Sequence, residues 1–313
     1  MRRFLLAIGL IALSSHIFGQ DSTVVQISKP VRNPWYSTLS LDNQTTYTPP
    51  QGTWEFNIIH RFSSINQGFS DLFGFYGSAN ISLFANYGIS DNIMLGFETV
   101  KEKKLQVFKA KYKIIEQTRD GRIPVSLALY GNACINAQKE AEFGKDFKEI
   151  DRMSYFCEGI VSRKIGKSAS ILASVGYSHI NKVSSIREKL ETISTNKVDT
   201  IITTITTTTT RYYPEFKNDA ISFSLSGRST VWRSIGVIAE FNYSSYLEKT
   251  DTLQNNPKPS LSLGFEVNTP THVLQLFLSS YRSIVPQYNY IMNQIDMTKK
   301  DGLMIGFNIF IRI

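Results

Sequence analysis

The sequence is poor in cysteine and has no long apolar run. Two cysteines in 313 residues are too few for a disulfide scaffold. After the first residues no apolar stretch approaches the roughly 18 residues that a spanning helix needs, which excludes a helical membrane protein. The sequence also has no phosphate loop, nucleophile elbow or dinucleotide-binding fingerprint, so no motif indicates an enzyme.

Aromatic and small polar residues are abundant. The 15 Tyr and 20 Phe help bring the aromatic fraction to 12%, which excludes wholesale disorder. Ser, Thr, Asn, Tyr and Phe together favour strands and turns. The net charge is +8, and nothing in the sequence indicates nucleic acid.

Residues 1–19 are predicted to be a secretory signal. Two arginines precede an apolar stretch at residues 4–13, and cleavage is expected between Gly19 and Gln20. A retained anchor is the alternative, but the apolar stretch is too short to span a bilayer. We therefore expect the protein to be exported.

Residues 20–52 are predicted to form an extended periplasmic leader. This segment contains four prolines with polar residues between them, and it shows no sustained hydrophobic period. We expect it to run along other surfaces of the protein, with the folded domain occupying residues 53–313.

From residue 53 onward, apolar and polar residues alternate over long stretches. Alternation of this kind predicts strands that have one apolar and one more polar face. Each stretch is about 9–12 residues long, which suits a tilted strand that crosses a bilayer better than a strand of a soluble protein. About twelve such strands are expected, at residues 53–62, 79–89, 93–101, 105–115, 124–135, 153–164, 169–179, 219–228, 235–246, 259–267, 272–281 and 302–312.

The connections between these strands alternate in length. Apart from the short connection at Glu102–Lys104, short gaps follow the even-numbered strands and long gaps follow the odd-numbered ones. Outer-membrane barrels show this asymmetry, with the short turns on the periplasmic side. Because lipid offers no hydrogen-bond partners, a sheet in a membrane must close on itself.

The sequence therefore predicts an all-β fold, a transmembrane antiparallel β-barrel of about 12 strands. Its apolar faces would point to lipid and its polar faces into the lumen, and an even number of strands puts both termini on the periplasmic side. A soluble sandwich or barrel is the alternative, because alternation alone does not identify which face is buried.

Three short tracts resemble an uncharacterised family of bacterial outer-membrane β-barrel proteins. They are Gly52–Phe62, Ala85–Asn92 and His272–Leu278, and the similarity runs from about Gly52 to Ile313. The resemblance implies an envelope location and a barrel fold. It supplies no activity and no binding residues.

Charged residues on the polar faces are the candidate lumen-lining residues. Lys109, Lys111 and Lys113 form a basic stripe along one strand. The polar faces of other strands add Glu55, Arg61, Glu98, Glu158, Arg228, Glu240, Glu266 and Arg312. Ionised groups inside a barrel need water or partners. A salt-bridged network and a water-filled passage lined by both signs both meet that requirement.

The histidines and cysteines indicate no metal site or disulfide. The histidines of the exported chain are dispersed, without metal-ligand spacing. His60 lies on an apolar face and is expected at the level of the lipid headgroups; a serine–histidine lipid hydrolase is the alternative, but no serine is well placed beside it. Cys134 and Cys157 are predicted on opposite faces, so they cannot bond.

Two loops have unusual compositions. Phe69–Tyr76 is apolar, and we expect it either to fold into the barrel as a constriction or to lie on the membrane surface. Ile201–Thr210 is rich in threonine, which favours strands that extend beyond the membrane.

The predicted function is passive and requires no cofactor. We expect an outer-membrane pore or transport channel for a small polar solute, or a structural envelope component, in contact with lipid and lipopolysaccharide. An assembly or adhesion partner acting through the long extracellular loops is the alternative. A lipid-modifying barrel enzyme is less favoured.

Overall fold

The computed structural model describes residues 28–313 except 33, 145, 184, 199–200, 250–254 and 300. The predicted secretory signal lies outside the described residues. Among the described residues, no helix has both the length and the apolar character needed to cross a membrane.

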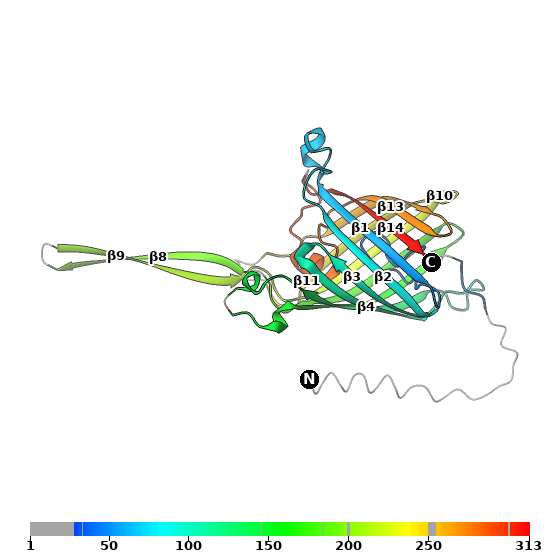
Figure 1. Ribbon diagram of the computed structural model, residues 1–313, viewed down its shortest axis with the longest axis horizontal. Helices are drawn as coiled ribbons and strands as arrows, with labels where there is room; N and C mark the ends of the chain where they lie inside the picture. The colour runs from blue at the N-terminus through cyan, green and yellow to red at the C-terminus, as the bar shows by residue number, and fades with distance from the viewer. Residues whose placement is uncertain are drawn as a thin grey trace, which may run out of the picture.

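Within the described residues, twelve antiparallel strands close into a barrel (Figure 1). Neighbouring strands follow one another in sequence, except that β7 pairs with β10, and β1 closes the barrel by pairing with β14. The strands are β1 (Trp54–Ser64), β2 (Asn80–Ser90), β3 (Ile93–Val100), β4 (Leu105–Ile115), β5 (Ser126–Asn136), β6 (Met153–Ile165), β7 (Ala169–Ile180), β10 (Asp219–Trp232), β11 (Ile235–Tyr246), β12 (Ser260–Asn268), β13 (His272–Ser279) and β14 (Met304–Arg312). The predicted fold and all twelve expected strands are confirmed.

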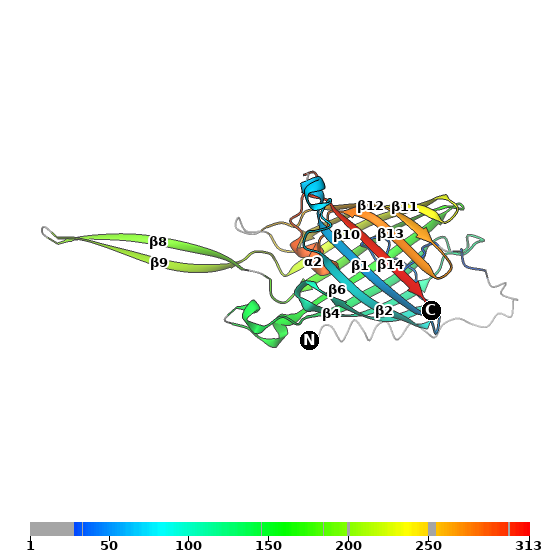
Figure 2. The same cartoon turned by 45° about the horizontal axis from the view of Figure 1, so that its top comes forward.

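A two-stranded hairpin projects from the barrel between β7 and β10. It consists of β8 (Ser185–Val198) and β9 (Ile201–Pro214), which pair with each other and form a separate sheet. Figures 1 and 2 both show it extending far beyond one end of the barrel. The threonine-rich segment therefore adopts the strand conformation that its composition favours.

The two faces of the barrel wall differ in the predicted sense. In β13, Leu274 and Leu276 are 43% and 57% exposed on the outer face, whereas Gln275 between them is 2% exposed. The other barrel strands repeat this pattern, with exposed apolar residues outside and buried polar residues inside. A soluble barrel would have the reverse arrangement.

The two ends of the barrel also differ. Short turns and the C-terminus lie at one end, and the β8–β9 hairpin projects from the other (Figure 1). The short helices lie in connections between strands: η1 (Ile65–Asp71), η2 (Glu102–Lys104), η3 (Glu140–Phe143), η4 (Glu149–Arg152) and α2 (Pro286–Met292).

The leader enters the barrel, and the surface along which it runs is the inner wall. At the short-turn end Pro30 bridges to Thr118, and the Val31 amide donates to the Gln117 carbonyl at 2.9 Å. Residues 35–49, here called the N-terminal plug, are then largely buried inside the barrel. The physical reason is that their hydroxyl, amide and backbone groups find partners on the polar inner wall.

A second segment enters from the opposite end. The connection between β13 and β14 turns inward, and α2 packs against the inner faces of β6, β7, β10 and β11. We call residues 280–293 the loop plug. The loop Phe69–Tyr76 takes no part in this constriction: Phe69 is 85% exposed, and Phe75 stacks on Phe62 at the outer face with ring centroids 4.1 Å apart.

Candidate functional site in the barrel lumen

The N-terminal plug makes a tight turn inside the lumen. The Ser40 amide donates to the Asn43 carbonyl at 2.8 Å, and the Thr45 amide donates to the Thr38 carbonyl at 2.9 Å. These bonds close a loop that places Asp42 at its tip. The turn thus satisfies some of its own backbone hydrogen-bonding groups, and its remaining polar groups bond to the wall.

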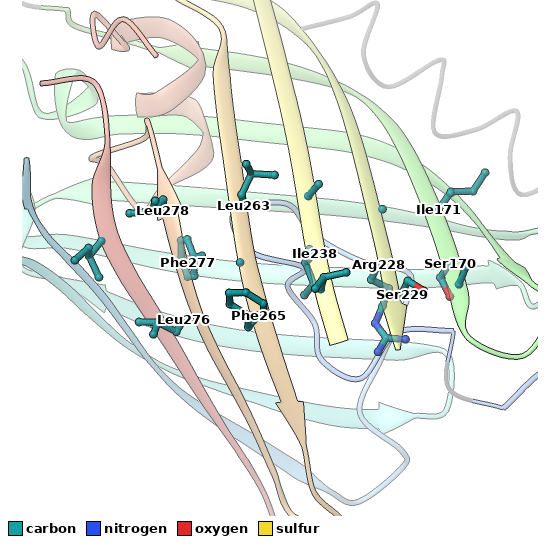
Figure 3. Close-up of a pocket in the computed structure, with 16 residues that line it drawn as sticks. Ser170, Ile171, Arg228, Ser229, Ile238, Leu263, Phe265, Leu276, Phe277 and Leu278 are labelled. Carbon is teal, nitrogen blue, oxygen red and sulfur yellow. The ribbon is translucent and has the colours of Figure 1, made fainter. Parts of the chain in front are cut away.

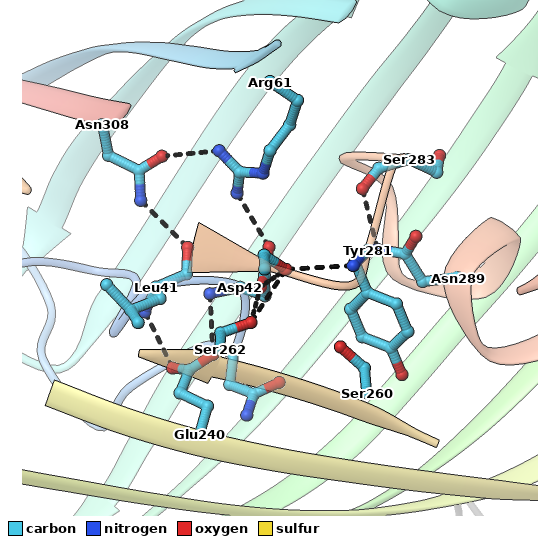
Figure 4. Close-up of polar contacts among 12 residues, drawn as sticks. Leu41, Asp42, Arg61, Glu240, Ser260, Ser262, Tyr281, Ser283, Asn289 and Asn308 are labelled. Carbon is cyan, nitrogen blue, oxygen red and sulfur yellow. Dashed lines mark hydrogen bonds and ion pairs between the residues drawn. The ribbon is translucent and has the colours of Figure 1, made fainter. Parts of the chain in front are cut away.

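Asp42 ties three strands together through its carboxylate. Its oxygens accept hydrogen bonds from Arg61 of β1 at 2.7 Å, from Ser262 of β12 at 2.7 Å and from Ser279 of β13 at 2.9 Å (Figure 4). The Arg61 and Asp42 side chains are both almost fully buried. Neither charge is stable there alone, because burying an unpaired ion costs far more than burying a paired one.

Glu240 of β11 holds the backbone of the same turn. Its carboxylate accepts the Leu41 and Asp42 amides at 2.7 and 2.8 Å, and the Ser226 hydroxyl at 3.2 Å (Figure 4). Asn43 donates to the same Ser226 hydroxyl at 3.1 Å. Two backbone donors aimed at one carboxylate form a charge-assisted anchor.

The rest of the plug is attached to further side chains of the wall, on β1, β4 and β6. Lys111 of β4 donates to the carbonyls of Thr38 and Tyr47 at 3.1 and 3.3 Å. The Thr38 hydroxyl donates to Glu55 of β1. The hydroxyl oxygens of Thr46 and Ser162 lie 2.6 Å apart. Side-chain contacts therefore attach the plug to several sides of the barrel wall.

Two further ion pairs join strands of the wall to each other. Lys109 pairs with Glu98, and Arg228 pairs with Glu266 at 3.1 Å, with all four side chains buried. Both partners of each pair belong to the wall, and the Arg228 guanidinium also packs over the Tyr36 ring of the plug, 4.3 Å from its centroid. These pairs show that part of the lumenal charge is paired across neighbouring or nearby strands.

An aromatic ring packs beside Arg61 and requires a glycine. The guanidinium of Arg61 lies over the Phe277 ring, 4.4 Å from its centroid. A Cβ at Gly306 would lie 2.9 Å from that ring and 3.1 Å from the Arg61 side chain. Gly306 therefore leaves the space in which this cation–π contact forms.

The structure places the sequence-predicted charged residues on the inner side of the barrel or at its rim. Most are buried on the inner wall: Glu55, Arg61, Glu98, Lys109, Lys111, Glu158, Arg228, Glu240 and Glu266. Lys113 and Arg312 lie towards the short-turn end and are less buried; Lys113 pairs with Glu116 at 3.1 Å, and Arg312 donates to Asn268 at 3.0 Å. Their assignment as functional lumen-lining residues stays a prediction.

Asp42 was missed by the sequence reasoning because it lies outside every alternating stretch. The available signal was compositional. The plug contains a dense run of small polar residues that are buried in the structure: Ser37, Thr38, Ser40, Asn43, Gln44, Thr45, Thr46 and Thr48. Such a run suits a polar lumen as well as it suits solvent.

The loop plug uses polar contacts of the same kind. Gln287 donates to Asn132 at 3.0 Å and to Ser154 at 3.2 Å, which joins α2 to β5 and β6. Ser244 and Tyr246 of β11 donate to backbone carbonyls of the helix, each at 2.8 Å. Pro286 is well suited to begin α2, since its missing amide would have no helical partner at that position.

The two plugs touch each other through Tyr290. Its hydroxyl lies 2.9 Å from the Ser224 hydroxyl and donates to the Asn43 side chain at 3.3 Å. Burial raises the pKa of the Tyr290 hydroxyl, so this group stays a neutral hydrogen-bond donor. Trp35 of the N-terminal plug and Tyr281 of the loop plug belong to the same apolar cluster as Tyr290.

A cavity of about 630 Å³ lies outside the loop plug, at the long-loop end. Tyr288 and Met292 of the loop plug form part of its lining. Charged side chains of both signs line the rest, including Lys103, Glu142 and Lys182. The loop plug therefore separates a mixed-charge vestibule from the N-terminal plug.

The histidine and cysteine side chains lie on both faces of the wall. His60 packs on the outer face against Phe62 and Phe307, with ring centroids 4.1 and 5.1 Å away. Cys134 is buried, Cys157 is exposed, and both are free thiols, as their opposite faces require. The described residues contain no group of three or more His, Cys, Asp or Glu side chains that could hold a metal ion.

A closed barrel with an apolar outer face and a polar interior defines the chain as a membrane β-barrel. Residues 35–312 match the family described as "Membrane bound beta barrel domain (DUF5777)", and the chain belongs to that family. The matched region begins at Trp35, so the N-terminal plug is part of the family's domain. No curated protein matches the chain.

Several solved barrels are similar to this chain at low sequence identity. The NanC porin is 6% identical with a TM-score of 0.45, over 82% of this chain and 97% of that one. The COG4313 outer membrane channel from Pseudomonas putida F1 is 8% identical with a TM-score of 0.46, over 87% and 99%. The CymD monoaromatic hydrocarbon channel is 10% identical with a TM-score of 0.32, over 84% and 88%. These similarities concern the barrel fold alone.

Proposed function

We propose that this protein is a gated outer-membrane channel for small polar solutes, closed at rest by its own N-terminal plug. The short turns face the periplasm in this proposal, and the outer surface contacts lipid and lipopolysaccharide. The observation that carries it is the way the plug is attached. Side-chain contacts hold it to a wall whose twelve strands already form a closed barrel.

Withdrawal of the plug is physically plausible because water can replace its contacts. Arg61, Lys111 and Glu240 would be hydrated in an open lumen, and the wall pairs of Lys109 and Arg228 would stay in place. The plug enters and leaves the lumen at the short-turn end, where Pro30 bridges to Thr118 and the Gly52 amide donates to the Gly88 carbonyl, so it can withdraw towards that end. The loop plug is held at both ends by β13 and β14 and can move only by local rearrangement.

Small polar solutes fit the chemistry of both the vestibule and the lumen. The vestibule and the lumenal wall carry charged groups of both signs together with hydroxyl and amide groups. Such surfaces offer hydrogen bonds to neutral polar or zwitterionic molecules and give little preference for one sign of charge.

A disulfide that fixes the plug tests the proposal. Thr46 and Ser162 have hydroxyl oxygens 2.6 Å apart, so cysteines at both positions can reach each other. In a Cys157→Ser background, the oxidised Thr46→Cys/Ser162→Cys protein should give no current in planar bilayers, and reduction should allow channel openings. The Thr46→Cys single variant is the control. Equal currents before and after reduction would show that the plug does not gate the lumen.

The projecting hairpin favours a second candidate function, adhesion or assembly with another macromolecule. Its two strands of 14 residues each extend well beyond the barrel and pair with no barrel strand. Replacing residues 185–214 by a short Gly-Ser linker should leave channel currents unchanged if the hairpin serves adhesion. Loss of a stoichiometric partner on purification of that variant would support this second function.

A lipid-modifying activity is not proposed. His60 contacts aromatic rings, and in the described part of the chain no serine hydroxyl hydrogen-bonds to it. A nucleophilic mechanism would need such a serine within hydrogen-bond reach of the imidazole. The expectation that the protein is not an enzyme stays a prediction.

A further inference from the structure

Two adjoining grooves hollow the outer face of the barrel. The larger, of about 790 Å³, extends from β7 to β14 (Figure 3), and the smaller, of about 570 Å³, lies mainly over β6, β7, β10 and β11. Gly227 and Ala239 line both grooves, and a Cβ added at Gly227 would meet no atom within 4 Å. The taller apolar side chains around this low floor include Ile171, Leu225 and Leu263.

Strand pairing places one arginine in line with this floor. Arg163 of β6 lies opposite Ile171, Ile171 lies opposite Gly227, and Gly227 lies opposite Ala239. Directly paired residues that face the same way have Cβ atoms only about 5 Å apart. Arg163 is exposed, lines the smaller groove and has no ion pair in the described part of the chain.

The paired residues from Arg163 to Ala239 form a row that runs from the rim of the barrel towards the middle of the wall. Arg163 is close to the short-turn end of β6, whereas Gly227 and Ala239 lie further along β10 and β11. This arrangement is what tilted strands produce, because residues in register lie at different depths in the bilayer. The cation therefore sits near the headgroup level, and the hollow floor lies within the hydrocarbon region.

Two more cations occupy the adjoining short turns. Lys167 lies between β6 and β7, and Arg233 lies between β10 and β11, and both are exposed. The Arg233 guanidinium packs over the exposed Trp232 ring, 5.0 Å from its centroid. An aromatic ring with basic groups at this level is typical of a membrane interface that contacts lipid phosphates.

We propose that these grooves bind one anionic phospholipid from the leaflet on the short-turn side. Arg163 would contact its phosphate, and an acyl chain would lie over Gly227 and Ala239. A guanidinium forms bidentate, charge-assisted bonds with phosphate, and an acyl chain fills an apolar hollow that rigid side chains leave open. The positive rim selects an anionic lipid over a zwitterionic one. This site is independent of the proposed channel function.

Native mass spectrometry of the full chain, released from detergent, tests the site. The probes are dioleoyl phosphatidylglycerol and dioleoyl phosphatidylcholine, titrated separately. We expect one phosphatidylglycerol molecule to be retained at concentrations at which phosphatidylcholine is not. Arg163→Gln should weaken its binding about tenfold or more, the factor expected for loss of one charged hydrogen bond.

Filling the groove provides a second variant with a matched control. Gly227→Leu places a side chain where the acyl chain would lie, so retention of phosphatidylglycerol should be lost. Gly131→Leu adds the same side chain on the outer face of β5, away from the grooves, and should bind as the unmodified protein does. Heat-modifiable migration on denaturing gels verifies that each barrel is folded.

Three outcomes would overturn the proposal. Equal retention of the two lipids would remove the role of the positive rim. Equal loss of binding in Gly131→Leu and Gly227→Leu would show that the effect is not local. A dimer that Gly227→Leu converts to monomer would assign the groove to a second copy of the chain.

Discussion

Replacing Asp42 by Asn is the most direct perturbation of the closed state. Asn is nearly isosteric, can still accept the Ser262 hydroxyl bond, and keeps the backbone amide that donates to Glu240. What it removes is the negative charge that faces Arg61 at 2.7 Å in a buried site. The variant therefore isolates the ion pair from the rest of the plug.

The magnitude follows from where Arg61 is solvated. Removing one partner of a buried ion pair costs about 3–5 kcal/mol, because the other charge is left without compensation. That penalty applies only with the plug in place, since Arg61 would be hydrated in an open lumen. A shift of about 3 kcal/mol corresponds to an increase of about 150-fold in the ratio of open to closed states.

Single-channel recording in planar bilayers measures this ratio as open probability. Asp301→Asn, which removes an exposed carboxylate in the β13–β14 connection, is the matched control and should behave as the unmodified protein. The double variant Asp42→Asn/Arg61→Gln should close again in part, because no unpaired charge remains. An unchanged open probability in folded Asp42→Asn would refute the assignment of Asp42 as the anchor of the plug.

Three further predictions test the wall and its orientation. Phe307→Arg puts a charge on the lipid-facing side of β14 and should destabilise the folded protein by about 2–4 kcal/mol. A reversible urea titration in vesicles measures this, with Phe307→Leu as the control. Equal stability of the two variants would argue against a lipid-facing position. Replacing Lys109, Lys111 and Lys113 together by Glu removes the partner of Glu98 and the donor to the plug carbonyls, so the free energy of unfolding should fall by several kcal/mol. An unchanged unfolding midpoint in the triple variant would contradict the assignment of these lysines to buried pairs. A protease site inserted at Thr206 should be cut in intact cells and one at Asp91 should be protected, and reversed accessibility would invert the proposed orientation.

The barrel itself could be predicted from the sequence because the alternation of apolar and polar residues in each strand reflects what lies on its two faces. The alternation in β13, with Leu274 and Leu276 outside and Gln275 inside, follows from contact with lipid on one side, whatever the rest of the chain does. The lengths of the alternating stretches and of the gaps between them predict the number of strands and the difference between the two ends of the barrel. Each of these signals is local, and none depends on a contact between distant residues.

The contents of the lumen could not be predicted in the same way. A polar inner face is satisfied equally by water, by other wall residues or by a segment of the chain, and alternation does not separate these cases. Arg61 and Glu98 both occupy polar-face positions of alternating strands. Arg61 nevertheless pairs with the plug, whereas Glu98 pairs with another residue of the wall. The proline-containing leader gave no periodic signal, because its partners lie on many strands rather than on one.

This difference in pairing bears on the chemistry of an open lumen. Lys109–Glu98 and Arg228–Glu266 join residues of the wall, so they remain neutral pairs whether or not the plug is present. In the proposed open state, the groups that would lose their plug partners carry both signs. Arg61 and Lys111 would be uncovered together with Glu55 and Glu240, on β1, β4 and β11. A wall that uncovers cations and anions together disfavours selection by net charge, and it favours solutes that present hydrogen-bond donors and acceptors at once.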